Sequence, residues 1–254
     1  MTKKRTLFGW TFFLIMLLAL FTIIFMQTAK ADSTGLSIQL EGLDSGEGAD
    51  VLEILATLTI IALIPSILMM TTCFTRIIIV LSCVRNAIGL QQSPPNQVLL
   101  GIALFLSMFI MSPVIGEVNE KAYQPYQQGQ ITQMQAAERA MEPMRGFMLR
   151  NTSAEDLNLF LDLGHFSRPE STDQIATTVL IPAFITSELK RAFIMGFMVY
   201  LPFLVIDMVV ASTLMSLGMV MLPPVLISLP FKLVLFVLVD GWGMTLKALV
   251  MGFH

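Results

Sequence analysis

Long apolar runs alternate with polar segments along the chain, and this alternation predicts five regions. The first apolar run, Leu7–Met26, follows three basic residues and precedes a small-residue site ending at Ala31, the layout of a secretory signal peptide over residues 1–31. The run is longer than usual, so an uncleaved signal anchor is the alternative. Residues 32–50 carry acids and no Lys or Arg, so we expect this segment outside the cytoplasm.

A nearly continuous apolar stretch, Val51–Val84, opens a predicted first helical hairpin of residues 51–116. A straight helix of that length would reach about 50 Å, whereas the hydrocarbon core of a bilayer is about 30 Å thick. Pro65 can kink this helix, and Arg76 and Arg85 should mark its cytoplasmic end. The prolines of the following loop cannot continue a helix, so a second span should run back outward.

Residues 117–181 differ in kind from these spans, because they hold nine acids and five basic residues. Helical propensity over Gln133–Arg150 predicts a small helical insert outside the cytoplasm, too short to bury a sizeable core of its own. Residues 182–254 are apolar again. Met219–Pro224 is predicted to be the tip of a hairpin between two long helical arms, and Phe231–Val250 is the returning arm.

Composition decides the class of protein. Hydrophobic residues make up 55% of the chain and charged residues 13%, whereas an ordinary soluble domain carries about 25% charge. The mean hydropathy is +0.77. Such a chain cannot cover its surface with polar groups, so lipid or other apolar subunits must cover part of it. We therefore expect an all-α integral membrane protein built from long kinked helical hairpins.

Charged residues interrupt the apolar C-terminal third, where each charge at the bilayer centre costs at least about 2.5–3.5 kcal/mol on insertion scales. Glu188 and Arg191 are spaced to share one face of a helix. Asp207 and Lys232 flank the hairpin and can pair across it or between protomers. The favoured interpretation is a set of assembly ion pairs, made by Glu188, Lys190, Arg191, Asp207 and Lys232. The alternative is a proton or ion pathway through Asp207 and Asp240.

Two methionines, Met219 and Met221, lie at the predicted tip beside the turn residues Pro223 and Pro224. Methionine is flexible and fills irregular apolar gaps. A ring of such tips would form a soft apolar constriction that closes by excluding water. A soft-metal site is the competing hypothesis, but no Cys or His lies nearby in sequence, so we expect neither a metal nor another cofactor.

The sequence contains no recognisable catalytic motif. H-E-x-x-H, G-x-S-x-G and the phosphate-binding G-x-x-x-x-G-K-[ST] are all missing, which argues against an enzyme. Cys73 and Cys83 would lie roughly 15 Å apart in a helix, too far for a disulfide. The net charge of −3, with no basic patch, argues against nucleic acid as a partner.

Several segments together resemble one family, the FliP flagellar biosynthesis proteins of type III protein export. The segments are Arg85–Gln92 with Pro94–Asn96, Pro182–Phe193, Pro202–Asp207, Leu229–Leu233 and Leu238–Trp242. The resemblance implies a homo-oligomer that assembles with FliQ, FliR and other membrane proteins of the flagellar export apparatus into a helical, conical gate for unfolded exported proteins. It implies an inner-membrane location at the flagellar basal body, with much of the assembly at periplasmic level.

The family also carries a run of methionines at its gate, matched here by Met219, Val220 and Met221. Val220 departs from that run, although it keeps the ring apolar. A subunit of a virulence injectisome is the alternative function. The long signal peptide and the polar insert, which the resemblance places in the periplasm, favour the flagellar branch.

Overall fold

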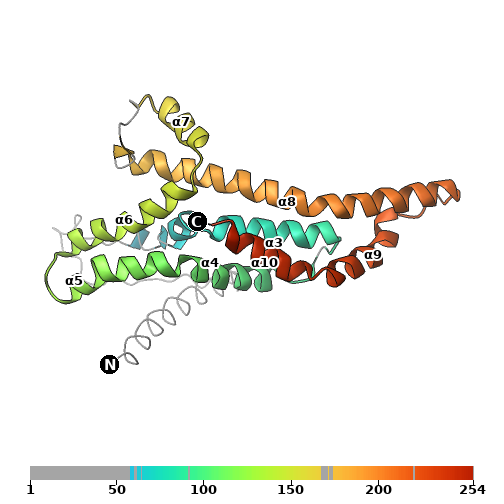
Figure 1. The fold of residues 1–254 in the computed structure, drawn as a ribbon, viewed down its shortest axis with the longest axis horizontal. Helices are drawn as coiled ribbons and strands as arrows, with labels where there is room; N and C mark the ends of the chain where they lie inside the picture. Colours follow the sequence, from blue (N-terminus) through green and yellow to red (C-terminus); the bar gives the residue numbers. More distant parts are fainter. Residues whose placement is uncertain are drawn as a thin grey trace, which may run out of the picture. The chain divides into compact units, whose positions relative to one another are not determined.

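The structure is a computed structural model that describes residues 58–59, 62–63, 65–90, 92–166, 171, 174–219 and 221–253. The chain divides into two units, Met1–Ser66 and Ile67–His254, and the architecture below is that of the second. The predicted signal peptide, its cleavage position Ala31 and the acidic segment 32–50 lie outside the described residues. Within the described ranges every regular element is a helix, which confirms the all-α class (Figure 1).

Nine helical elements follow one another between Phe74 and Met251 in the described part of the chain. In order they are α3 (Phe74–Ile88), α4 (Asn96–Val118), the π-helical turn η1 (Asn119–Tyr123), α5 (Gln124–Gln127), α6 (Gln133–Asn151), α7 (Ala154–Leu163), α8 (Thr177–Ser216), α9 (Pro224–Leu238) and α10 (Gly241–Met251).

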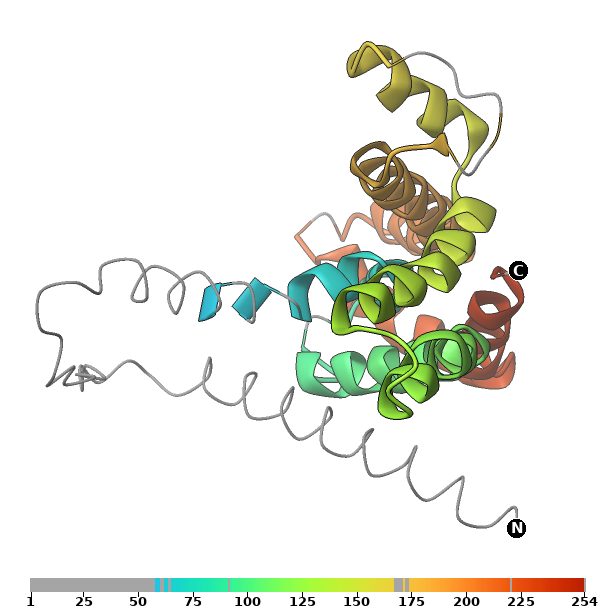
Figure 2. The same ribbon diagram turned by 90° about the vertical axis from the view of Figure 1, so that its left-hand side faces the viewer.

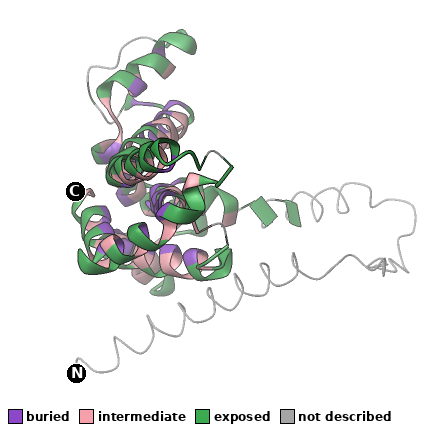
Figure 3. Ribbon diagram, turned by 90° about the vertical axis from the view of Figure 1, so that its right-hand side faces the viewer, coloured by how far each residue is buried: buried purple, intermediate pink, exposed green. Residues whose placement is uncertain are grey.

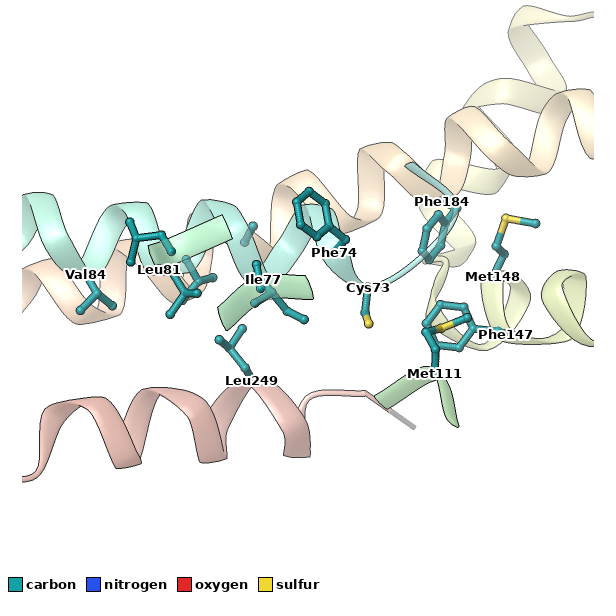
Figure 4. Packing of buried hydrophobic residues seen from close by; sticks show 14 of the residues in the cluster. Cys73, Phe74, Ile77, Leu81, Val84, Met111, Phe147, Met148, Phe184 and Leu249 are labelled. Atoms are coloured by element: carbon teal, nitrogen blue, oxygen red, sulfur yellow. The ribbon is translucent and has the colours of Figure 1, made fainter. Parts of the chain in front are cut away.

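Helix α3 is the centre of the second unit. It packs against α8, α4 and α9, while α6 bridges α4 and α8, as Figure 2 shows. The apolar side chains of α3 are consequently buried around much of its circumference. Ile77 and Leu81 lie opposite Leu249 of α10, and Phe147 of α6 packs edge-on against Phe184 of α8 (Figure 4).

A glycine lets α3 and α8 approach closely. A Cβ atom built on Gly196 would lie 2.7 Å from Sγ and 2.9 Å from Cβ of Cys83, well inside van der Waals contact. Cys83 and Cys73 are both free thiols, as their spacing predicts. The contact between the two helices therefore depends on the missing side chain at position 196.

Two helices of the described part are long and apolar enough to cross a membrane, Asn96–Gln127 and Thr177–Ser216. A third span results if the bent pair α9 and α10 counts as one. The 40 residues of α8 reach about 60 Å at 1.5 Å per residue, twice the hydrocarbon thickness of about 30 Å. Part of α8 must therefore extend beyond the lipid.

The helices do not end where the polarity of the sequence changes. The predicted boundary at residue 117 falls within a continuous helical path from Asn96 to Gln127, because η1 continues the turns of α4 into the polar region. The boundary at residue 182 falls within α8, which already begins at Thr177. Polarity reports the surroundings of a side chain, whereas a helix continues as long as its backbone hydrogen bonds do.

Two of the predicted helices are broken. The returning arm Phe231–Val250 is two helices, α9 and α10, which meet at an angle of 61°. Before α3, a turn at Thr71–Cys73 interrupts the predicted first helix. There the hydroxyl of Thr71 donates to the carbonyl oxygen of Ile67 at 2.9 Å, one of the local bonds by which Thr competes with a regular helix ladder.

Candidate functional site

The candidate site is the α8–α9 hairpin, and its tip is a defined turn. Gly218 has a φ of 73°, the left-handed conformation that glycine adopts without strain. The amide of Gly218 donates to Met215 O at 3.1 Å and that of Met219 to Leu214 O at 3.0 Å, which together form a Schellman motif that ends α8. Pro223 is the N-cap of α9 and Pro224 its first residue. Proline suits this first position because its missing N–H would have no helical partner there.

The predicted tip methionines are turned outward. Met221 is 99% exposed and Met219 is 47% exposed. The rest of the protomer therefore covers almost none of the Met221 side chain. Val220 lies outside the described residues. The tip therefore presents apolar side chains to whatever surrounds the protomer, and its function as a gasket stays a prediction.

The two arms are joined by an ion pair. Lys232 Nζ of α9 donates to Asp207 Oδ2 of α8 at 2.6 Å, and the hydroxyl of Ser228 donates to Asp207 Oδ1. Lys232 and Ser228 are buried. Of the two pairings that the sequence left open, the structure has the one across the hairpin of a single chain.

Lys232 also connects the hairpin to α3. Its Nζ lies 3.5 Å from the carbonyl oxygen of Ala87 in the last turn of α3, where the helix dipole places partial negative charge. Two residues further on, the αL residue Gly89 ends α3, and a Cβ atom there would lie 3.2 Å from Leu229 Cδ1. The middle of α9, at Leu229 and Lys232, is thus fixed against the C-terminal end of α3.

Glu188 pairs with Arg76 of α3, in a bidentate contact of two side chains that are 0% and 1% exposed. Arg76 Nη1 also donates to Gly252 O at 2.7 Å, and its guanidinium lies 3.7 Å from the centroid of the Phe253 ring. Arg191, the partner suggested by sequence spacing, interacts with Glu188 only electrostatically. Arg76 lies inside the bundle, where the buried Glu188 neutralises it, and its place at the cytoplasmic end of a membrane span stays a prediction.

Lys190 forms a third ion pair of α8, to an acid that the sequence analysis did not single out. Its Nζ lies 2.8 Å from Asp156 Oδ1 of α7, and the hydroxyls of Ser153 and Ser187 donate to Asp156 Oδ2 at 2.6 and 2.7 Å. Burial opposes the charge, but the hydrogen bonds from Lys190, Ser153 and Ser187 outweigh it and lower the pKa of Asp156 to about 2. The serine cap before an acidic first turn, Ser153-x-x-Asp156, was the available signal.

An open apolar groove of about 500 Å³ runs between α8 and α9 toward the tip. Eight residues line it: Val205, Ile206, Val209, Val210, Thr213, Leu214, Ile227 and Phe231. The described part of the chain has no group of three or more His, Cys, Asp or Glu side chains placed to hold a metal ion.

These features define a class: an all-helical membrane protein with buried ion pairs inside the protomer and, among the described residues, its most exposed large apolar side chain, Met221, at a hairpin tip. The chain belongs to the FliP family, whose family model matches residues 57–249. It is therefore a membrane component of flagellum biogenesis and protein export, and the family is not a known enzyme family.

Three relatives, each named flagellar biosynthetic protein FliP, show how far the similarity extends. The Bacillus subtilis protein is 51% identical over 205 residues, covering 81% of this chain and 93% of the relative. The Pectobacterium carotovorum protein is 54% identical over 200 residues, covering 79% and 78%. The Borreliella burgdorferi protein is 44% identical over 239 residues, covering 91% and 94%.

Proposed function

We propose that this chain is a pore-forming subunit of the flagellar type III export gate, through which unfolded flagellar proteins cross the inner membrane. Several copies would assemble with the partner membrane proteins FliQ and FliR. The observation that carries the proposal is the near-complete exposure of Met221 at the end of a hairpin whose arms are held by the ion pair between Asp207 and the buried Lys232. An apolar side chain held out on a fixed support needs a partner surface, and symmetry-related tips would supply it.

The outer side of α8 supports assembly. Its exposed apolar residues recur at helical spacing and form one stripe, which we call the α8 stripe. Figure 3 shows the turns of α8 nearest the tip mainly as exposed. The stripe comprises Phe193, Ile194, Phe197, Met198, Leu201, Leu204, Val205, Met208 and Val209. Because α8 is about twice as long as the lipid core is thick, lipid cannot cover its whole length. Neighbouring subunits would cover the remainder.

The proposed gate works by excluding water. Met219, Val220 and Met221 from several tips would meet in an apolar ring too narrow to stay hydrated, which blocks ions while no substrate is present. Flexible methionine side chains can then repack around a passing chain of varied sequence. Val220 between them retains the apolar character of the ring but contributes less flexibility.

The ion pairs have a structural function in this proposal. Glu188, Lys190, Asp207 and Lys232 would hold the arms in the geometry that lets protomers pack, and Arg191 adds to the field at Glu188. The insert 117–181 would lie in the periplasm, with much of the assembly lifted to that level. The names of the relatives are flagellar, which supports a flagellar gate over an injectisome.

The test is ion leakage through assembled complexes. Replacing Met219 and Met221 together by Ala should raise the conductance of small ions, and replacing both by Gly should raise it further, because the ring loses apolar volume. The matched control is Met215→Ala, which removes an equally apolar side chain, 66% exposed, from the last turn of α8 before the tip. The mass of the detergent-extracted complex reports assembly. An assembled tip variant with wild-type conductance would show that the tip is not a gasket.

A further inference from the structure

The break between α9 and α10 is built around one residue in an unusual conformation. Asp240 has φ 49° and ψ 55°, the left-handed region that side-chain-bearing residues seldom enter. Asp and Asn enter it more readily than other residues because their short polar side chains bond locally. The two helices meet here at 61° with only Val239 and Asp240 between them.

Asp240 ends one helix and begins the next. Its amide donates to Val237 O of α9 at 3.2 Å, and its carbonyl oxygen accepts from the Met244 amide of α10 at 3.0 Å. Its side chain accepts from the Gly243 amide at 3.3 Å, which is an N-cap. The other turn of the hairpin uses Gly218 in the same left-handed conformation, but glycine has no side chain to cap a following helix.

The residues around Asp240 leave this bend little freedom. A Cβ atom on Gly243 would lie 2.2 Å from Asp240 Oδ2, and one on Gly241 would lie 2.2 Å from the Phe236 ring. The Phe236 ring cannot yield easily, because Trp242 packs on it edge-on at 5.4 Å between centroids and Phe203 packs against it at 6.3 Å. Gly241 is therefore required by the packing against Phe236, whereas a side chain at position 243 would displace the capping carboxylate of Asp240.

The two helices that meet at this bend have different attachments. The far end of α10 is fixed in the bundle, because Gly252 O accepts from Arg76 and Leu249 is fully buried. Helix α9 leads from the bend to Pro224 and the tip, and along the way it is held to α8 and to the end of α3 through Lys232. The direction in which α9 leaves α10 is therefore one of the constraints on where the tip lies relative to the anchored part of the protomer.

We propose that Asp240 is a positioning residue for the hairpin tip: its left-handed backbone and its side-chain cap on α10 together fix the bend from which α9 carries the tip. The expected effect on export rests on the proposed gate function, whereas the geometric part of the proposal does not depend on that function. Asp240 acts through the backbone and the cap, not through its negative charge.

Three substitutions separate these contributions in the full-length protein expressed with its natural partners. Asp240→Asn keeps an oxygen acceptor and tolerates the left-handed conformation, so export and the ion tightness of the membrane should stay near wild type. Asp240→Gly keeps the backbone but loses the cap, and should reduce export partly. Asp240→Ala loses both and should largely lose export. A carboxylate in a proton pathway would reverse the first result, since Asp240→Asn would then fail like Asp240→Ala, and the proposal would be overturned.

A distance measurement tests the geometry without reference to export. Spin labels at Met221→Cys and Met244→Cys, both exposed positions, report the separation of the tip from α10 in purified complexes diluted with unlabelled subunits. Cys83→Ala removes the partly exposed native thiol, and Cys73 is fully buried. The distribution should shift and broaden in Asp240→Ala and stay unchanged in Asp240→Asn. An unchanged distribution in Asp240→Ala overturns the proposal, and if that variant does not accumulate, Asp240→Gly gives the same decision.

A variant at a different residue provides an independent check. Gly243→Ala should displace the capping carboxylate and shift the distance as Asp240→Gly does, whereas Gly116→Ala, which would meet no atom within 4 Å, should not. If the distance shifts but neither export nor leakage changes, the positioning stands and the gate function fails. If Gly243→Ala leaves the distance unchanged, the cap does not fix the bend and the positioning fails.

Discussion

Arg76 and Glu188 lie 112 residues apart in sequence and form an ion pair whose side chains are 1% and 0% exposed. The pair joins the first turn of α3 to the N-terminal third of α8. Because Arg76 also binds Gly252 O, the same guanidinium holds the C-terminal segment. Three parts of the chain far apart in sequence thus meet at one buried charge.

Removing one member of this pair should be strongly destabilising. Arg76→Met or Glu188→Met leaves an unpaired buried charge, with an expected cost of about 3–5 kcal/mol. The double variant removes both charges and should be more stable than either single one. Thermal unfolding in detergent measures the order. Lys121→Met, which removes an exposed pair with Glu117, is the control and should change stability by about 0–1 kcal/mol.

The Asp207–Lys232 pair distinguishes assembly from transport. Asp207→Ala should leave the buried Lys232 without its carboxylate, loosen the two arms and reduce the amount of assembled complex. Exchanging the two residues, Asp207→Lys with Lys232→Asp, should recover part of the loss. The mass of the detergent-extracted complex is the measurement. A variant that abolishes transport while the oligomer keeps its size would favour an ion pathway instead.

Gly196→Ala should separate α3 from α8. The added methyl group would meet both Sγ and Cβ of Cys83, and no rotamer change moves the Cβ. Overpacking of this kind costs about 1–3 kcal/mol. The control is Gly101→Ala, also in a helix, where no neighbour lies within 4 Å. Equal melting temperatures for the two variants would contradict the close approach of these helices.

The attachment of α7 to α8 should depend on pH in the acid range. The pKa of Asp156 is about 2, against an ordinary value of 3.8, so its stabilisation is complete above pH 3.8 and is lost as the pH falls from there through 2. Proteolysis of the α7 segment by an acid-stable protease should accelerate across this window. Asp156→Asn should cleave readily at all pH values and show no such step. Because Lys190 is 55% exposed, solvent screening should keep its share of the effect small.

Features that depend on neighbouring residues were predictable from the sequence. The lengths of the apolar runs predicted the membrane helices, and the Met219–Pro224 segment, between Gly218 and the arm of α9, predicted the turn. Asp207 and Lys232 could be paired in advance because a hairpin brings its two arms together.

Features that depend on tertiary contacts were not predictable in this way. Arg76 lies in an apolar run that locally resembles the end of a membrane span, and only the fold brings Glu188 to it. Asp156 is one acid among several in a polar segment, and its burial comes from the position of α7 on α8. The bend at Asp240 was missed because Asp is not a usual marker of the left-handed conformation.

The length of α8 makes the protomer a lever. Glu188 fixes the helix near one end, and the tip begins just after Ser216, a distance of about 42 Å along a continuous helix at 1.5 Å per residue. A tilt of about 5° at the Glu188 end would displace the tip by roughly 4 Å over that length, comparable to the width of a methionine side chain. Small rearrangements around the Arg76–Glu188 pair would therefore be mechanically amplified at the opposite end of the helix.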